Sequence, residues 1–360
     1  KLPKKKFALL LGYCGTGYTG MQINRSVRTI EYELHRAFAL SGVIGFMRAA
    51  RTDKGVHAAG QVVSLKIMEL DNLVERINKH LPAQIRIWGY VRTQNSFNCK
   101  TSCDSRVYEY LLPTYVLQPP NPRYYPNSRI ANLAGVVLTE EEKAAAGEFN
   151  VLPPATRDDV NNLRAYRASA EVLDALREAL GMYLGSKNYH NFTIRKAFTD
   201  RSAIRKIMWF KCGEPFIRDD IEWVSCKVFG QSFMMHQIRK MIGLAIMMIR
   251  TKTPPSLIPL AWGATKLNIP KAPGVGLLLE RTVYKVYNEK NLDKPIEFEP
   301  YESTIEEFKK EWIYSKMIEE ETKNAVFAKW ARCIDERSPD YAWFLNGDGQ
   351  IHEEQRPEYL

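Results

Sequence analysis

Residues 48–60 read Arg48-Ala49-Ala50-Arg51-Thr52-Asp53-Lys54-Gly55-Val56-His57-Ala58-Ala59-Gly60 and place one carboxylate among several basic side chains. Small residues flank Asp53, and Gly55 permits a tight turn that presents this carboxylate instead of burying it. The charges of Arg48, Arg51 and Lys54 are expected to keep it ionised, which suits a nucleophile better than a proton donor. The simpler alternative is an exposed turn in which Asp53 merely pairs with Arg51.

Length and charge set the broad class of the protein. A chain of 360 residues suits two domains with ample material for a buried core. Lys and Arg number 51 against 41 Asp and Glu, which gives a net charge of +10. This favours a polyanionic partner, most simply nucleic acid, although a basic protein without such a partner is an alternative. The six cysteines form no C-x-x-C pair, and we interpret them as reduced thiols of an intracellular protein: Cys14, Cys99, Cys103, Cys212, Cys226 and Cys333.

Targeting and membrane signals are sparse. No stretch approaches eighteen consecutive apolar residues, so we expect no membrane span. The first residue is Lys1 rather than Met, and we therefore expect the natural amino terminus and its targeting signals to lie upstream. The run Lys4-Lys5-Lys6 slightly favours the end of a basic nuclear signal over a solvated chain start.

A glycine-rich segment, residues 15–20, follows a predicted buried strand over residues 7–13. Its G-x-G-x-x-G spacing is typical of dinucleotide-binding folds, which also need a helix opening on the last glycine and an acidic residue on a second strand. Here the next predicted helix begins near Thr29, and Glu31 and Glu33 lie inside it. We therefore predict no nucleotide cofactor.

Periodicity predicts the elements of the first half of the chain. Strand and helix patterns alternate, which indicates an α+β sandwich with helices on a sheet. The strand over residues 106–112 would project Arg106, Tyr108 and Tyr110 from one face. Its tyrosines equally suit a half-exposed strand that packs on a helix. The other predicted elements are a helix over 29–41 with Thr29 as N-cap, a strand over 61–67, a helix over 70–81 and a strand over 85–92.

The second half begins after a proline-rich stretch over residues 118–162, which we interpret as a domain junction with an insertion. An apolar stripe at helical spacing, from Phe233 to Ile242, predicts a core helix. Arg239 lies beside this stripe, where a basic residue usually extends to solvent. Further predicted elements are helices over 168–185, 305–317 and 323–333 and strands over 203–210 and 222–229.

Ordered motifs across the chain resemble those of the TruA-type tRNA pseudouridine synthases. Arg51 to Ala58 matches the family pattern Arg-Thr-Asp-x-Gly-Val-His-Ala without departure, and the resemblance implies that Asp53 is the catalytic residue. Arg106-x-Tyr108-x-Tyr110 matches the next family strand, which implies that Tyr108 stacks on the target base. An aromatic platform restores stacking to a base that has left the helix.

Two later motifs complete the resemblance. Phe233-x-x-His236-x-x-Arg239 matches a helix whose arginine pairs with the catalytic aspartate, and Ala272-Pro273-x-x-Gly276-Leu277 matches a motif whose leucine packs against the uracil. The resemblance thus implies catalytic Asp53, Tyr108 and Arg239, and substrate-binding Arg48, Arg51, Lys54, Leu277 and Arg106. His190, within a His-Asn-Phe stretch similar to that of the family, suits a structural role at least as well and stays outside the catalytic set.

The resemblance also implies a fold of class α+β. Two related α/β domains with mainly antiparallel sheets would meet at a central basic cleft, with helices added at the carboxyl end. The expected parts are 1–117 with Asp53 and Tyr108, 118–167 as insertion or linker, 168–287 with Arg239 and Leu277, and 288–360 as a helical extension.

The activity that the resemblance implies is isomerisation of specific uridines to pseudouridine in tRNA, extending to snRNA and mRNA. The reaction has no redox step, so no cofactor is expected, although Cys99 and Cys103 leave a structural zinc open. A catalytically silent RNA-binding or tRNA-folding module is the alternative. The wording of the motifs is similar to the eukaryotic, fungal branch. We expect the nucleus as the location, with the mitochondrion or cytoplasm as additional compartments. The added helices favour a monomer because they would cover the surface through which the bacterial relatives dimerise.

Overall fold

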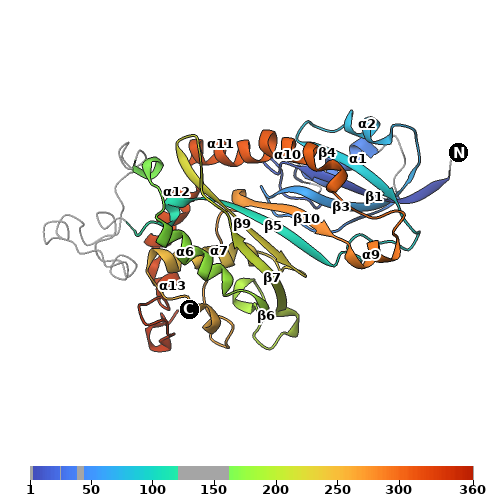
Figure 1. The fold of residues 1–360 in the computed structure, drawn as a ribbon. Helices are drawn as coiled ribbons and strands as arrows, with labels where there is room; N and C mark the ends of the chain where they lie inside the picture. The colour runs from blue at the N-terminus through green and yellow to red at the C-terminus, as the bar shows by residue number, and fades with distance from the viewer. Residues whose placement is uncertain (1–2, 25, 39–43, 121–161, 360) are drawn as a thin grey trace. The chain divides into compact units, whose positions relative to one another are not determined.

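The structure is a computed structural model and describes residues 3–24, 26–38, 44–120 and 162–359 (Figure 1). Within these ranges the chain is a mixed α and β protein whose ten strands form a large, mainly antiparallel sheet accompanied by helices. This agrees with the predicted α+β class, whereas the basic cleft and the four-part division of the chain stay predictions. The predicted junction over 118–162 lies almost wholly outside the described residues. No helix in the described ranges has the length and apolar content needed to cross a bilayer.

The first of two compact units comprises Lys1–Tyr110, Phe229–Ser232 and Gly274–Glu320. Its strands lie in the order β4-β1-β3-β10-β5, with β2 beside β3. These pairs are antiparallel except for β10 and β3, which are parallel. Its elements are β1 (Lys4–Tyr13), α1 (Ile30–Phe38), β2 (Ile44–Arg48), β3 (His57–Met68), α2 (Leu73–Asn78), β4 (Ile85–Arg92), most of β5 (Ser105–Pro113), β10 (Leu277–Val283), α9 (Lys285–Lys290), α10 (Glu302–Phe308), the π-helical η7 (Lys309–Tyr314) and most of α11 (Ser315–Asn324).

Strand β10 brings together segments that are far apart in the sequence. Leu278 pairs with His57 at the start of β3, directly after the Asp53 motif. On its other edge Leu279 pairs with Tyr108 of β5. The aspartate motif and the tyrosine strand therefore lie one strand apart in the same sheet.

Helices near the carboxyl end cover this part of the sheet, and Figure 1 shows α10 alongside β4. The ring of Phe308 packs edge-on against Trp88 of β4, with ring centroids 5.2 Å apart. A Cβ added at Gly89 would lie 2.0 Å from the Tyr301 hydroxyl, so β4 needs glycine at this contact. Strand β5 is buried along most of its length, and its residues do not alternate between buried and exposed as a half-exposed strand would.

The second compact unit comprises Leu111–Val228, Phe233–Pro273 and Glu321–Leu360. Its strands lie in the order β9-β7-β6, and β8 pairs with β9. Its elements are α6 (Ala170–Gly181), β6 (Gly185–Asn188), β7 (Ile204–Cys212), β8 (Phe216–Arg218), most of β9 (Ile221–Gly230), α7 (Gln237–Arg250), α8 (Leu257–Leu260), α12 (Val326–Glu336) and α13 (Ser338–Ala342), with short 3-10 turns such as η2 (Thr114–Leu117) and η3 (His190–Phe192).

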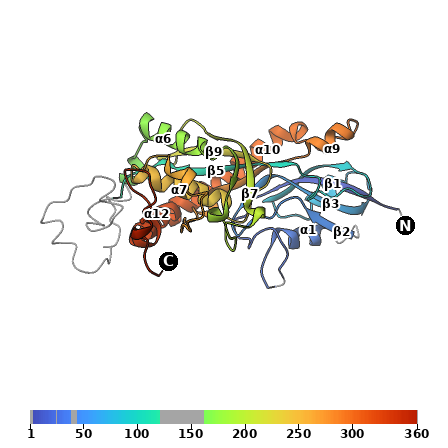
Figure 2. The ribbon, with the colours of Figure 1, turned by 90° about the horizontal axis from the view of Figure 1, so that it is seen from below.

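Helix α7 forms the core of this second unit. It packs against α6, which also contacts β7, and the two helices lie together in both views (Figures 1 and 2). The hydroxyl of the buried Tyr183 donates to the carbonyl of Met241 in α7, at 3.0 Å. At the end of the helix Arg250 forms a buried ion pair with Asp335 of α12, at 2.5 Å. These contacts confirm the predicted core helix.

Several predicted boundaries were wrong, for local reasons. Helix α7 begins at Gln237 and not at Phe233, because His236 adopts a left-handed backbone with φ 63° that no right-handed helix continues through. Helix α2 begins only after Asn72, which is left-handed with φ 54°. The predicted helix over 168–185 ends at Gly181, and Gly185, with φ 91°, instead begins strand β6.

Candidate active site

Asp53 lies in the loop that joins β2 to β3. Its side chain is partly exposed, while Thr52 before it and Val56 after it are buried. The amide of Val56 donates to the Asp53 carbonyl at 3.1 Å and closes a tight turn in which Gly55 has φ 74°. The predicted turn, which presents the carboxylate instead of burying it, is thus confirmed.

The glycine-rich segment after β1 packs directly behind this loop. A Cβ added at Gly20 would lie 2.7 Å from the Thr52 carbonyl oxygen, and one added at Gly15 would lie 2.2 Å from that of Val56. Beyond Gly20 the amide of Met21 donates to the Thr52 carbonyl at 3.1 Å. No helix opens on Gly20, since α1 starts ten residues later at Ile30. The glycines therefore serve close approach to the aspartate loop.

His57 lies under the same loop and is fully buried. The amide of Gly15 donates to its Nδ1 atom at 3.1 Å. An accepting Nδ1 requires the neutral ring, and burial lowers the pKa of His57 to about 4. His57 is therefore a neutral structural residue that joins the glycine segment to the start of β3.

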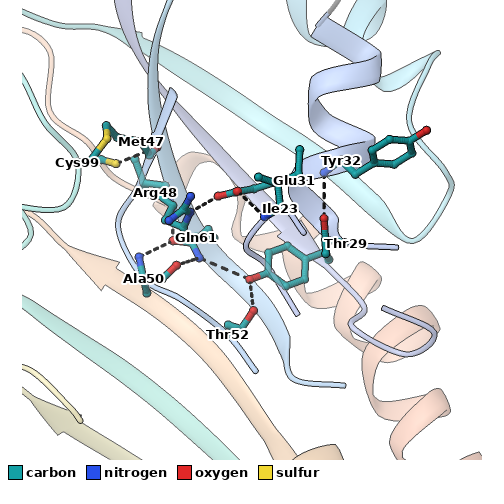
Figure 3. A network of polar contacts seen from close by, with 12 residues as sticks. Ile23, Thr29, Glu31, Tyr32, Met47, Arg48, Ala50, Thr52, Gln61 and Cys99 are labelled. Atoms are coloured by element: carbon teal, nitrogen blue, oxygen red, sulfur yellow. Dashed lines mark hydrogen bonds and ion pairs between the residues drawn. The ribbon is translucent and has the colours of Figure 1, made fainter. Parts of the chain in front are cut away.

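A network of polar side chains holds the chain on the amino-terminal side of Asp53 (Figure 3). The Gln61 amide bonds both backbone groups of Ala50, accepting from its N–H at 3.1 Å and donating to its carbonyl at 2.9 Å. The Tyr13 hydroxyl lies 2.8 Å from Oγ1 of Thr52. The side chains of Tyr13 and Gln61 are fully buried. Two side chains from β1 and β3 therefore fix positions 50 and 52.

The basic residues around Asp53 have different surroundings. Arg51 and Lys54 are exposed. The Arg48 guanidinium forms an ion pair with Glu31, whose other oxygen accepts from the Ile23 amide at 2.7 Å. The sequence alone did not predict this pairing. Arg106 donates to the carbonyls of Ala49 and Gln231, at 3.1 Å each.

Tyr108 and Leu277 lie on the neighbouring strands β5 and β10. Each is 8% exposed. Burial raises the pKa of Tyr108 to about 12, the nearby Arg106 charge lowers it, and the Asp53 charge adds to the rise. The Asp53 charge therefore acts on the Tyr108 hydroxyl, and the grouping of these two residues in one site stays a prediction.

Arg239 belongs to the second unit and lies in the first turn of α7. Its Nε donates to the carbonyl of Ala272 at 2.6 Å, and its own carbonyl accepts from the Ala272 amide at 3.0 Å. The side chain is partly exposed. Its stem is thereby fixed against the Ala-Pro segment that precedes β10.

His190 is 2% exposed and packs edge-on against Phe198, with ring centroids 5.4 Å apart. Burial, helped by the Lys266 charge, lowers its pKa and favours the neutral ring. The sequence suited a structural role at least as well as contact with RNA. The burial and ring packing suit a structural residue, although neither ring nitrogen has a hydrogen-bond partner among the described residues.

The thiols of Cys99 and Cys103, which the sequence left as possible zinc ligands, donate hydrogen bonds to backbone carbonyls. Cys99 donates to Met47 and Cys103 to Ser105, each at 3.3 Å. Burial raises the pKa of Cys99 to about 11 and also raises that of Cys103, which favours protonated thiols over the thiolates that zinc requires. Across the described ranges, no three His, Cys, Asp or Glu side chains are grouped closely enough to hold a metal ion.

Our sequence analysis missed the supporting residues Tyr13, Gln61 and Glu31. Gln61 is fully buried within β3, between Gly60 and Val62, and Glu31 is 1% exposed in α1. A buried polar residue must find hydrogen-bond partners, and this is the signal that could have marked both. Among their partners, Arg48 lies 17 positions from Glu31, and Ala50 and Tyr13 lie 11 and 48 positions from Gln61, so these pairs cannot be read from the sequence.

Comparison with known proteins gives consistent matches. A family profile described as tRNA pseudouridine synthase matches residues 179–285. The chain is 41% identical to tRNA pseudouridine synthase 1 of Yarrowia lipolytica, over 92% of this chain and 74% of that protein. It is 42% identical to tRNA pseudouridine synthase 1 of Candida glabrata, over 93% of this chain and 71% of that protein. Pseudouridylate synthase 1 homolog of Mus musculus is 38% identical, over 93% of this chain and 74% of that protein.

Proposed function

The chain belongs to the TruA family of tRNA pseudouridine synthases, and from this premise we propose that it isomerises specific uridines in tRNA to pseudouridine, with Asp53 as the catalytic carboxylate. Membership confirms the resemblance that the ordered motifs predicted. The observation that carries the assignment of Asp53 is its setting: a partly exposed carboxylate on a tight turn between Thr52 and Val56, which are both buried and hydrogen-bonded. A carboxylate held in this way is pre-organised for a substrate.

The reaction exchanges one glycosidic bond for another. The bond from N1 of uracil to the sugar C1′ breaks, the base turns, and C5 bonds to C1′. C5 then loses its proton and N1 gains one, so no oxidant, reductant or hydrolytic water is consumed and no cofactor is needed. Asp53 attacks C1′, adds to the uracil ring or removes the proton at C2′, and each path requires the ionised carboxylate.

Tyr108 is proposed as the platform on which the target base stacks. Its raised pKa, about 12, keeps the phenol protonated at neutral pH. It therefore suits a stacking surface better than a base for the C5 proton. Leu277, two residues before the β10 position that pairs with Tyr108, supplies an apolar wall for the uracil.

Arg239 is proposed to pair with Asp53 and to keep it ionised when RNA excludes water from the site. The hydrogen bond from its Nε to the Ala272 carbonyl orients the guanidinium, and the planar fork of donors in a guanidinium suits a carboxylate. Arg51 and Lys54 are proposed to contact RNA phosphates through their exposed cationic ends. Arg48 and Arg106 are proposed to contact the RNA through guanidinium N–H groups other than those that bond to protein.

Release of tritium from C5-labelled uridine in tRNA tests this function, because that hydrogen is lost only when C5 becomes the glycosidic carbon. The full chain should release tritium, and Asp53→Ala should abolish release while tRNA binding is retained. Asp53→Asn provides the matched control, since it keeps the shape of the side chain and removes only its charge. It should be as inactive as the alanine variant.

The alternative is a catalytically silent RNA-binding or tRNA-folding module. It predicts tight binding of tRNA without tritium release from any RNA. That outcome would contradict the enzyme proposal and support the binding module. A chelator distinguishes a metal-dependent reaction from the proposed one. The proposed reaction needs no metal, so tritium release should be unchanged when chelator is present.

We further propose that uridines in snRNA and mRNA are substrates, and that the protein acts as a monomer in the nucleus. The same tritium assay on transcripts of each RNA class tests the first point. Light scattering of the purified chain tests the second, and imaging of the tagged full-length protein tests the third. Activity confined to tRNA, a dimer, or a location in mitochondria or cytoplasm would contradict the corresponding point.

A further inference from the structure

We propose that Tyr13 and Gln61 are positioning residues for the reaction, which hold the backbone at positions 50 and 52 and thereby set the place of the Asp53 carboxylate. This inference rests on the proposed function, because it assigns a catalytic consequence to the support of Asp53. Neither residue belongs to the motifs that identified the family. Figure 3 shows Gln61 beside Ala50, together with Thr52, and the hydroxyl of Tyr13 bonds to both Gln61 and Thr52.

The side chain of Gln61 takes the place of a neighbouring strand for the backbone of Ala50. Its side-chain amide bonds the N–H and the carbonyl of Ala50 at 3.1 and 2.9 Å, as a neighbouring strand would. Just before, the amide of Ala49 still donates to the carbonyl of Val62 at 2.9 Å, so the β2-β3 ladder leads directly into this clamp. The chain can therefore leave the sheet toward Asp53 without losing its backbone hydrogen bonds.

The contacts also fix the direction of the hydrogen bonds. Oε1 of Gln61 accepts from the amides of Ala50 and Val62, so Nε2 must face the Ala50 carbonyl and the Tyr13 hydroxyl, the latter at 3.5 Å. Tyr13 accepts from Gln61 at this distance, and we assign it as the donor of the 2.8 Å hydrogen bond that it shares with Oγ1 of Thr52.

Thr52 is the residue directly before the carboxylate, and it is held at two points. Tyr13 bonds its side chain, and the amide of Met21 bonds its carbonyl at 3.1 Å. Burial raises the pKa of Tyr13 well above that of a free tyrosine, so the hydroxyl remains a donor at every pH at which the enzyme would work. Tyr13 thus orients Asp53 without exchanging protons with the substrate.

The consequence of losing this support should appear in the chemical step. Misplacement of a reacting group by about 1 Å can cost on the order of 100-fold in rate. Asp53 is only partly buried and directly follows Thr52, so the backbone that Tyr13 and Gln61 hold sets the point from which its side chain extends. Binding of tRNA draws on many contacts elsewhere and should change little.

The experiment compares Tyr13→Phe with the unmodified full chain under single-turnover conditions, measuring tritium release and tRNA affinity separately. We expect the rate to fall about 10- to 100-fold with unchanged affinity. Because Tyr13 does not titrate, the pH profile of the rate should keep its shape and only move down. Thr52→Val should reproduce the loss, Thr52→Ser should restore most of it, and the double variant of Tyr13→Phe with Thr52→Val should lose no more than either alone.

Tyr189→Phe is the matched control, since Tyr189 is also fully buried and donates one hydrogen bond, at 2.7 Å, to the Tyr183 carbonyl. It should lower the unfolding midpoint about as much as Tyr13→Phe and leave the rate unchanged. An unchanged rate for folded Tyr13→Phe and Thr52→Val, with Asp53→Ala inactive, overturns this inference and leaves the proposed function intact. A changed pH profile would overturn it in favour of a proton-transfer role. If the unmodified chain releases no tritium from any RNA, the proposed function fails and the inference fails with it.

Discussion

At the scale of single residues, the site depends on buried groups that remain neutral. His57 accepts a hydrogen bond from the Gly15 amide and has a pKa of about 4, against 6.5 for an exposed histidine. Protonation would destroy the acceptor and place a charge in a water-free position. The aspartate loop is therefore coupled to the pH of the solution through a residue that takes no part in the reaction.

This coupling predicts an acid-sensitive fold. The pKa of His57 is lower in the folded state, so the unfolded chain binds more protons between pH 6.5 and about 4, and stability is lost as pH falls through this window. From pH 7 to pH 5 the loss should be about 2 kcal/mol. His57→Asn, which keeps an acceptor for Gly15, should lack this part of the loss. Urea unfolding at both pH values measures the difference.

The exposed His80 supplies the control for that experiment. His80→Asn should lose as much stability between pH 7 and pH 5 as the unmodified chain. If His57→Asn also loses the same amount, His57 is not the group that makes the fold acid-sensitive.

Residue-scale predictions succeeded where the deciding contact is local. Thr29 caps α1 as predicted, because its hydroxyl accepts from the Tyr32 amide three residues later, at 3.3 Å. The Tyr13 contact joins residues 39 positions apart, and the pairing of Arg48 with Glu31 spans 17. Such partners depend on the packed sheet, and so the sequence identified Asp53 but not the groups that hold it.

At the scale of elements, a buried charge cluster fixes the carboxyl-terminal helices to the sheet. Lys309 of η7 is 1% exposed, and its ammonium lies 2.8 Å from Glu280 of β10 and 3.7 Å from Glu109 of β5. Burial lowers the pKa of Lys309, but Glu280 and Glu109 outweigh this and raise it overall. The cluster thus joins η7 to the two strands that carry Leu277 and Tyr108.

Lys309→Met should therefore destabilise the protein by about 3–5 kcal/mol, since it leaves two mostly buried carboxylates without their cation. Urea unfolding at pH 7 measures this loss. Lys285→Met is the control: Lys285 is exposed and 3.9 Å from Glu289, and its removal should cost less than about 1 kcal/mol. Equal losses for the two variants would show that the cluster does not hold the helices.

Most elements could be predicted from hydrophobic period and capping, and their order along the chain was largely right. Strand β2 was missed because Gly42 to Met47 is short and shows no clear alternation. Strand β10 was not assigned because its role depends on pairing with β3 and β5 more than 150 residues away. Boundaries failed where left-handed residues such as His236 end a helical pattern.

At the scale of the whole molecule, the net charge of +10 indicated a polyanionic partner before any motif was considered. Composition does not say which charges meet the polyanion. In the structure two of these basic side chains, Arg48 and Arg106, are bonded to protein groups. Arg51 and Lys54 are exposed, and no ion pair or hydrogen bond of their side chains occurs among the described residues. Exposure and the lack of protein partners single these two out for phosphate contact.

Arg51→Gln and Lys54→Gln should each weaken tRNA binding and reduce the slope of log affinity against log salt by about 0.7 to 0.9, the value for one phosphate contact. Filter binding at several salt concentrations measures the slope. Arg177→Gln removes the same charge from a side chain that is paired at 2.8 Å with both Asp174 and Glu214, and it should leave the slope unchanged. If all three variants reduce the slope equally, attraction by net charge explains binding without a defined contact. If Arg51→Gln and Lys54→Gln keep the full slope, these residues do not neutralise phosphates, and the RNA must approach Asp53 along another part of the surface.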